Sequence, residues 1–427
     1  LWQSYTVSEP EVPHMAGLFL HRQLVGIPSG DAGTVFNEDI WNTHHDWFEE
    51  QLSDALADTA RIQVSDDDGI VSVYLHASGN GGVSWEAYAC HPQSPDPDNE
   101  WWTAPAPANQ LAPGVEVFFY YSATDGVGNT ATYPEDAPDA HFEMSILPIT
   151  ASMSEPGMLL VDKHHRRTPG ETRNYDHSSQ YYYREMLGIL GYEWDAYEVE
   201  VESGSTDQSN GPDSAGYKYY DTQIWFTNEF NTTTIKKPDQ VNLVNWLNQS
   251  ADGKERNLLV TGNDIGYELI ETGVETLNFY SSWLASEYVS NQVGSVVVDS
   301  VPGLRDRAGG WTFMNHDDGE SILRGGCPIL NYFDVVNARS GIVGNEVAVD
   351  YVKLDSSTRP AGVAYAHGTM GYQTVNLGFG MEFMMDGMLP NGYYRTGVWD
   401  RSNLMGNILD YFGRPPDGPG TGVVEGA

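Results

Sequence analysis

Cysteine is scarce in this chain. Only two of its 427 residues are cysteines, Cys90 and Cys327. They lie far apart in the sequence and outside any C-x-x-C motif, which argues against a zinc site. The spacing leaves two alternatives open, a single disulfide or two buried free thiols.

Basic residues are also few. Lys and Arg together number 21 against 60 Asp and Glu, so the formal net charge is -39. Such a chain repels phosphate groups, which argues against nucleic acid and anionic lipid as partners. The acidic surplus has two readings that stay open here. It is a solvated surface, including one adapted to high salt, or some carboxylates bind divalent cations such as calcium.

Long apolar runs are missing as well. No stretch of about 18 apolar residues occurs, so the sequence predicts no membrane insertion. Hydrophobic residues nevertheless make up 40% of the chain, which is typical of a globular protein. A chain of this length has room for two or three domains.

Residues 1–58 read as an N-terminal extension. The apolar spacing between residues 38 and 60 predicts one helix. Residues 1–7, LWQSYTV, alternate like a strand, and Trp2 and Tyr5 could anchor this strand in the sheet of a neighbouring subunit. Contacts of that kind run head to tail and build filaments. Pairing of the same strand within its own chain is the alternative.

Residues 59–150 predict a β-sandwich, because short alternating runs are punctuated by Asp-Gly and Gly-Asn turns. The matching stretches are Asp66 to Ile70, Tyr120 to Asn129 and Tyr133 to Pro138. This segment resembles the immunoglobulin-like or fibronectin-like modules of secreted bacterial proteins. The resemblance implies an Ig-like fold and an extracellular or cell-surface location.

Acidic turns of this sandwich could hold calcium. Asp66, Asp68, Asp125 and Asn129 could bring several oxygens to one end of the sheets, and calcium prefers six to eight oxygen ligands. Asp-Gly turns also form without any ion, so both readings stay open. No other cofactor is expected.

Residues 151–413 alternate apolar strands with helices, which predicts βαβ units and a parallel sheet. After about residue 295 the pattern becomes richer in strands. Residues 414–427 contain many Pro and Gly residues and read as a linker. The predicted fold class is therefore multidomain, a β-sandwich followed by an α/β domain with β-rich additions.

One turn in this domain has the outline of a catalytic motif. The apolar run 258–261 is followed by Gly262-Asn263-Asp264-Ile265-Gly266 and then by a helical pattern. A nucleophile elbow has this outline, with its reactive residue at the centre. Asp264 could act as a carboxylate nucleophile with His367 as its base. Alternatively, Asn263 and Asp264 cap the helix that follows.

The same domain resembles the class I glutamine-amidotransferase-like fold, which is flavodoxin-like. Versions of it occur in large secreted bacterial proteins, including C-terminal regions of gingipain-type peptidases. The matching stretches are 159–163, 190–199, 220–228, 258–266, 375–383 and 404–413. Catalytic members carry Cys at the elbow and a His with an acid after a late strand. Here the elbow carries Asp264, and Glu382 follows the late strand without an adjacent His.

The sequence thus predicts a secreted or cell-surface protein that is structural or interacting rather than catalytic, and that assembles into extracellular filaments. Its expected partners are proteins, including other copies of itself, and the aromatic residues also admit carbohydrate. The alternative is the accessory C-terminal region of a secreted peptidase, or a hydrolase acting through Asp264.

Overall fold

The computed structural model describes part of the chain, in two compact units, Leu1–Ile149 and Thr150–Ala427. Trp2, Tyr5, Asp68 and Cys327 lie outside the described residues. No helix in the described part is long and apolar enough to cross a membrane. The described ranges are 25–28, 32–38, 46–48, 60–66, 69–92, 100–104, 109–110, 114–163, 179–199, 211–212, 216–228, 232–293, 303–309, 311–314, 321–323, 333–353, 356–385 and 398–418.

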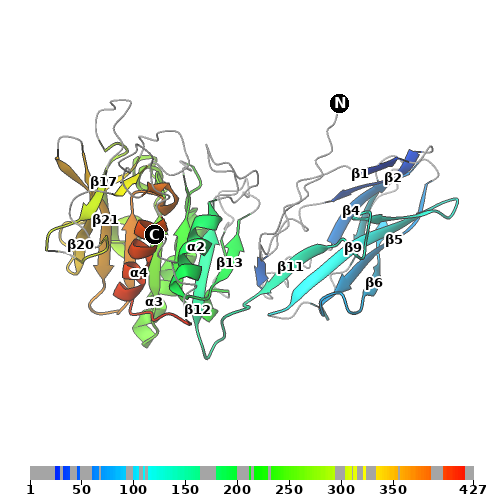
Figure 1. Ribbon diagram of the computed structural model, residues 1–427, viewed down its shortest axis with the longest axis horizontal. Helices are drawn as coiled ribbons and strands as arrows, with labels where there is room; N and C mark the ends of the chain where they lie inside the picture. The colour runs from blue at the N-terminus through cyan, green and yellow to red at the C-terminus, as the bar shows by residue number, and fades with distance from the viewer. Residues whose placement is uncertain are drawn as a thin grey trace, which may run out of the picture. The chain divides into compact units, whose positions relative to one another are not determined.

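The first unit contains two β-sheets, and Figure 1 labels several of their strands. One has the order β1 (Val25–Pro28), β2 (Ala32–Glu38), β4 (Ala60–Ser65), β8 (Glu100–Ala104) and β7 (His91–Pro92). The other has the order β3 (Asp46–Phe48), β11 (Phe142–Leu147), β9 (Glu116–Asp125), β5 (Ile70–Ser78) and β6 (Glu86–Ala89), and β10 (Thr130–Tyr133) pairs with β9. All these pairs are antiparallel except that of β3 with β11.

A single core joins the two sheets of this unit. Buried residues of β9 alternate with less buried ones, the period of two expected of a strand with one face on a core. Phe119 and Tyr121 of β9 belong to the same buried cluster as Ile62 of β4 and Trp102 of β8. The two sheets therefore pack face to face.

At residues 46–48 the structure differs from the helix predicted between residues 38 and 60. These residues form β3, which pairs in parallel with β11. A short apolar segment fits either structure by its pattern alone. An open sheet edge offers a complete set of backbone hydrogen bonds, and this tertiary partner outweighs local helix propensity.

The second unit is built on a ten-stranded mixed sheet. Five parallel strands form its first half, in the order β13 (Asp195–Glu198), β12 (Gly157–Asp162), β14 (Tyr220–Phe226), β15 (Asn257–Thr261) and β22 (Gln373–Leu377). The sheet continues with antiparallel neighbours, β21 (Thr358–Ala366), β20 (Asn345–Val352), β17 (Gly303–Asp306), β18 (Ser321–Leu323) and β23 (Met384–Met385). A separate pair consists of β16 (Ser286–Ser290) and β19 (Val335–Ala338).

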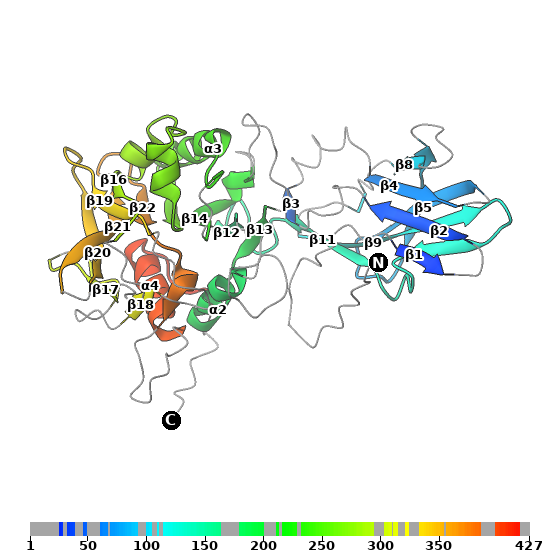
Figure 2. The ribbon, with the colours of Figure 1, turned by 90° about the horizontal axis from the view of Figure 1, so that it is seen from above.

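Helices cover both faces of this sheet. Figure 2 shows α3 (Lys237–Asn248) on one side and α2 (Gln180–Leu190) with α4 (Val398–Tyr411) on the other. Every residue of β12 and β15 is buried, because both faces of these strands are covered, and this explains their continuous apolar runs. A multidomain chain with an α/β unit and β-rich additions was predicted, and at this level the prediction is confirmed.

Candidate functional site

One group of buried polar side chains of the second unit lies where the parallel strands end. Asp162, Phe226, Thr261 and Leu377 lie side by side as the last residues of β12, β14, β15 and β22. In parallel sheets this carboxyl edge is where ligands usually bind. The buried polar residues at or just beyond it include Asp162, Lys163, Thr227, Asn228, Thr261, Asn263, Asp264 and Glu382.

The predicted elbow follows β15 at this edge, and close packing explains its two glycines. A side-chain carbon at Gly262 would lie 2.0 Å from Thr227 Oγ1, and one at Gly266 would lie 2.6 Å from the Tyr280 hydroxyl. Neither position has room for a larger residue. A helical segment then runs through Tyr267–Glu271. The two glycines of the Gly-x-Asp-x-Gly pattern are therefore required by packing, whatever the chemistry of Asp264.

Asp334 lies against the start of this helical segment. The sequence pattern did not indicate this residue. It lies just before β19 and is fully buried. Its Oδ2 accepts the backbone N–H groups of Gly266 at 2.6 Å and Tyr267 at 3.2 Å. Its own N–H donates to the carbonyls of Asn263 at 3.0 Å and Gly378 at 2.9 Å. Asp334 therefore ties the elbow to the end of β22.

Asp334 and Asp264 form an acidic pair. Burial raises the pKa of Asp334 well above its usual value, and the charge of Asp264 raises it further, while the Tyr267 and Gly266 N–H groups lower it. Asp264 is itself only 6% exposed. Within the described part of the chain, Asp334 Oδ1 and the Tyr280 hydroxyl have no hydrogen-bond partner. Two close carboxyls in a dry site do not both ionise readily, so Asp334 retains its proton above the usual pH.

Glu382 lies at the same edge as the elbow. The Tyr183 hydroxyl donates to Glu382 Oε2 at 2.6 Å, and the Gly380 N–H donates to Asn263 Oδ1 at 3.0 Å. Burial, followed by the charge of Glu382, raises the pKa of Tyr183. Asn263 thus links the elbow to the turn that carries Glu382, as part of a buried polar network.

The prediction that His367 serves Asp264 as a base is wrong. His367 follows β21, which runs antiparallel to β22, and the last residue of β21, Ala366, pairs with Gln373 at the start of β22. The elbow follows Thr261, which pairs with the end of β22. His367 therefore lies at the opposite edge of the sheet. There its Nδ1 accepts the N–H groups of Met370 and Thr369, closing a turn.

In the first unit, Asp125 serves a turn. Its Oδ1 accepts the N–H groups of Val127 at 3.0 Å and Asn129 at 2.8 Å, and its Oδ2 accepts the Asn129 amide at 2.8 Å. Burial opposes the charge of Asp125, but hydrogen bonds led by Asn129 outweigh it and lower its pKa. The Gly126 N–H donates to the Gly69 carbonyl, which brings this turn beside the one that begins at Asp66.

The remaining ligand candidates are not joined into a metal site within the described ranges. Those residues contain no group of three or more His, Cys, Asp or Glu side chains placed to hold a metal ion. Asp68 lies outside them. Cys90 is a buried free thiol, and burial raises its pKa to about 12.

Comparisons with known proteins leave the chain without an assigned family. No protein-family model and no curated protein matches it. One similar solved structure is a cold-adapted β-galactosidase from Rahnella sp. R3, with a TM-score of 0.33 and 10% identity over 62% of this chain and 32% of that one. Another is a cyclomaltodextrinase, with a TM-score of 0.16 and 14% identity over 58% and 40%.

A third is the type III pullulan hydrolase from Thermococcus kodakarensis, with a TM-score of 0.15 and 12% identity over 48% of this chain and 38% of that one. The chain spans between 32% and 40% of the length of these three proteins. At such low TM-scores the likenesses carry no argument about activity, and the function has to be derived from the chain's own geometry.

Proposed function

We propose that this protein is a non-catalytic binding or structural protein of the cell surface or the extracellular space. An Ig-like sandwich precedes a flavodoxin-like, amidotransferase-type domain whose elbow serves the fold. The observation that carries the proposal is the Asp334 carboxyl group on the N–H groups of Gly266 and Tyr267.

That contact disfavours catalysis for an electrostatic reason. In hydrolases built around an elbow, the N–H group of the residue after the nucleophile, at the start of the following helix, helps to stabilise the negative charge that develops on the substrate. Here the next two N–H groups of that helix start, those of Gly266 and Tyr267, are donated to the Asp334 carboxyl group. A developing oxyanion on the Ile265 N–H would therefore form next to a group that already uses this end of the helix, and no His lies near Asp264 in the described part of this edge.

The strand order supports the finer assignment of the second unit. Numbered along the chain, its five parallel strands are arranged 2-1-3-4-5 across the sheet, from β13 through β12, β14 and β15 to β22. This is the order of flavodoxin-like folds. For the first unit, two face-packed sheets with a shared core support an Ig-like sandwich.

One observation favours the second candidate, a hydrolase acting through Asp264. A carboxyl that keeps its proton beside one that is ionised is the arrangement by which enzymes obtain an acid and a base from identical groups. Asp334 has the first part of this character, because burial and the charge of Asp264 raise its pKa. The two candidate functions therefore predict different effects of removing the Asp264 carboxylate on hydrolysis.

The deciding experiment compares the wild type with Asp264→Asn. Purified protein is incubated with ester, amide, peptide and glycoside substrates, and Asp252→Asn, an exposed acid in the same unit, is the matched control. We expect no turnover that distinguishes the three proteins. Hydrolysis that is lost in Asp264→Asn, retained in Asp252→Asn and unrelated to a change in melting temperature would overturn the proposal.

Self-assembly through Trp2 and Tyr5 belongs to the same proposal. Sedimentation of the protein with and without residues 1–7 tests it, because filaments built by strand addition require this segment. Assemblies that persist after the deletion would contradict it.

A further inference from the structure

A pocket of about 580 Å³ opens at the edge of the sheet opposite the elbow. Its described lining consists of Gly309, Trp311, Thr312, Glu346, Asn407 and Asp410. These residues come from the turn after β17, the first residues of β20 and the last turn of α4. The three elements lie together in the second unit (Figure 1).

Trp311 is the aromatic side chain of this pocket's described lining, and contacts with neighbouring residues hold it in place. Its side chain is 48% exposed, although its ring makes an edge-to-face contact with Tyr411 at 4.7 Å. The backbone N–H of Trp311 donates to Glu346 Oε1 at 3.3 Å. The next residues are fixed too, because the N–H groups of Phe313 and Met314 both donate to Asp306 Oδ1 at 2.7 Å. An exposed indole held in place in this way is prepared for a ligand before the ligand arrives.

The polar lining is acidic. Glu346 and Asp410 both border the pocket, and its described lining includes no Lys or Arg. Asn407 donates its amide to the Phe313 carbonyl at 2.7 Å, so it contributes mainly an oxygen acceptor. The net charge of -39 adds a negative field over the whole chain. A neutral ligand would leave both carboxylates uncompensated, an anion would be repelled, and a cation is favoured both locally and at long range.

We propose that this pocket binds an arginine side chain of a partner protein. A guanidinium is planar, so it can lie flat on the Trp311 indole while its N–H groups donate to Glu346 and Asp410. It also satisfies the acceptor oxygen of Asn407. The inference rests on the proposed binding role and names the chemistry of the partner.

The test uses a small probe and follows the indole directly. Protein labelled with ¹⁵N at tryptophan is titrated with N-acetyl-arginine amide, and the Trp311 signal is identified by its loss in Trp311→Phe. The same titration with N-acetyl-citrulline amide supplies a neutral probe of nearly the same shape. We expect the Trp311 signal to shift saturably with arginine and to remain in place with citrulline.

Three further variants complete the design. Glu346→Gln and Asp410→Asn should each weaken binding about threefold, the loss typical of one exposed charge pair. Asp252→Asn removes an exposed acid of the same unit outside the pocket and should leave the affinity unchanged. Because each change is isosteric and lies at the surface, loss of binding does not arise from loss of fold, and melting temperatures verify this.

Several results would overturn the inference. A Trp311 signal that does not move, or that moves equally with citrulline, excludes a guanidinium site. Shifts spread over many indoles and insensitive to Glu346→Gln would indicate general attraction to an acidic surface. A shift with maltose instead of arginine would make the pocket a sugar site. None of these results affects Asp334 at the elbow, whereas hydrolysis through Asp264 would overturn the proposed function and leave this titration unchanged.

Discussion

Asp334 holds together three parts of the second unit. It joins the elbow, the end of β22 and the start of β19, which are far apart in the chain. The Tyr351 hydroxyl adds to this junction by donating to the carbonyls of Asp334 at 2.9 Å and Gly378 at 3.0 Å. The side chain supplies a hydrogen-bond acceptor that the helix needs, and it carries a charge that its surroundings disfavour.

Two substitutions separate these contributions. Asp334→Asn keeps an oxygen for the N–H groups of Gly266 and Tyr267 and removes the charge. Asp334→Ala leaves both N–H groups without an acceptor and should lower the free energy of unfolding by about 2–4 kcal/mol. Urea denaturation near neutral pH should therefore find Asp334→Asn at least as stable as the wild type and Asp334→Ala clearly less stable.

The pH dependence has a defined sign. The pKa of Asp334 is raised on folding, so its contribution to stability is complete below the unfolded pKa, near 3.8, and is lost as the pH rises through the folded pKa. The wild type should therefore lose stability relative to Asp334→Asn as the pH rises from about 4 toward neutral. A difference between the two proteins that is constant across this range would contradict the raised pKa.

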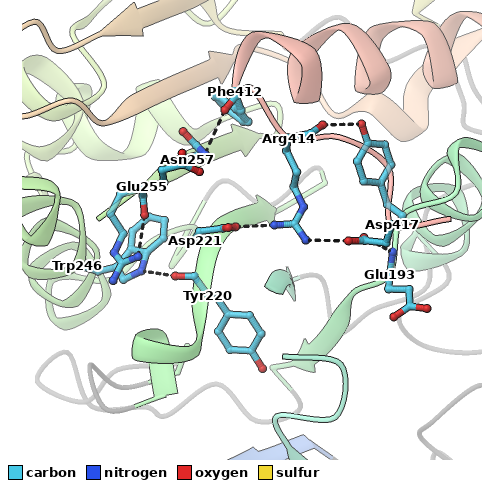
Figure 3. Close-up of polar contacts among 11 residues, drawn as sticks. Glu193, Tyr220, Asp221, Trp246, Glu255, Asn257, Phe412, Arg414 and Asp417 are labelled. Carbon is cyan, nitrogen blue, oxygen red and sulfur yellow. Dashed lines mark hydrogen bonds and ion pairs between the residues drawn. The ribbon is translucent and has the colours of Figure 1, made fainter. Parts of the chain in front are cut away.

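At the scale of elements, the segment after α4 is attached to the second unit, although its composition predicts a linker. Residues 414–418 begin the Pro- and Gly-rich stretch read as a linker, yet they are tied to the second unit (Figure 3). Arg414 forms an ion pair with Asp221 of β14 at 2.6 Å, and its carbonyl accepts the Tyr192 hydroxyl at 3.0 Å. The Gly418 N–H donates to the Gly191 carbonyl at 2.9 Å. These contacts hold the end of α4 against β14 and the end of α2.

Arg414→Met tests this attachment. Burial raises the pKa of Asp221, and the charge of Arg414 is the largest effect that opposes that rise, so removing the arginine leaves a mostly buried carboxylate with only Thr222 and the charge of Arg256 in its favour. We expect a loss of about 1–3 kcal/mol in the free energy of unfolding. The double variant Arg414→Met with Asp221→Asn should recover part of this loss, and a double-mutant cycle by urea denaturation measures the coupling. Additive effects would show that the ion pair does not contribute.

At the scale of the whole molecule, charge is the dominant property. A net charge of -39 repels itself in the compact state, and added salt screens that repulsion. We expect the melting temperature to rise by about 5 °C between low and high NaCl. Calcium chloride at matched ionic strength, applied to the wild type and to Asp125→Asn, separates screening from a specific ion. A melting temperature independent of salt would argue against an electrostatic limit on stability.

The sequence alone was sufficient for features that depend on neighbours along the chain. Continuous apolar runs predicted the buried strands β12 and β15, because strands covered on both faces have no polar side. The elbow was visible because Gly262 and Gly266 are needed wherever a strand turns tightly into a helix against close neighbours. The order of a β-rich region followed by an α/β region was also predicted from local patterns along the chain.

Tertiary structure decided which of these features meet. His367 and Asp264 follow strands in the same sheet, but β21 runs antiparallel to β22 and this direction places them at opposite edges. Asp334 lies directly before β19, where no sequence motif marks it. Its charge within the apolar stretch Phe333 to Val336 is the one sequence signal that could have indicated it. The strand at Asp46–Phe48 required a partner nearly a hundred residues away. Local sequence pattern determines which segments form helices and strands. Strand direction and long-range pairing arise only when the whole chain buries its core. That direction and that pairing determined which side chains meet in the candidate site.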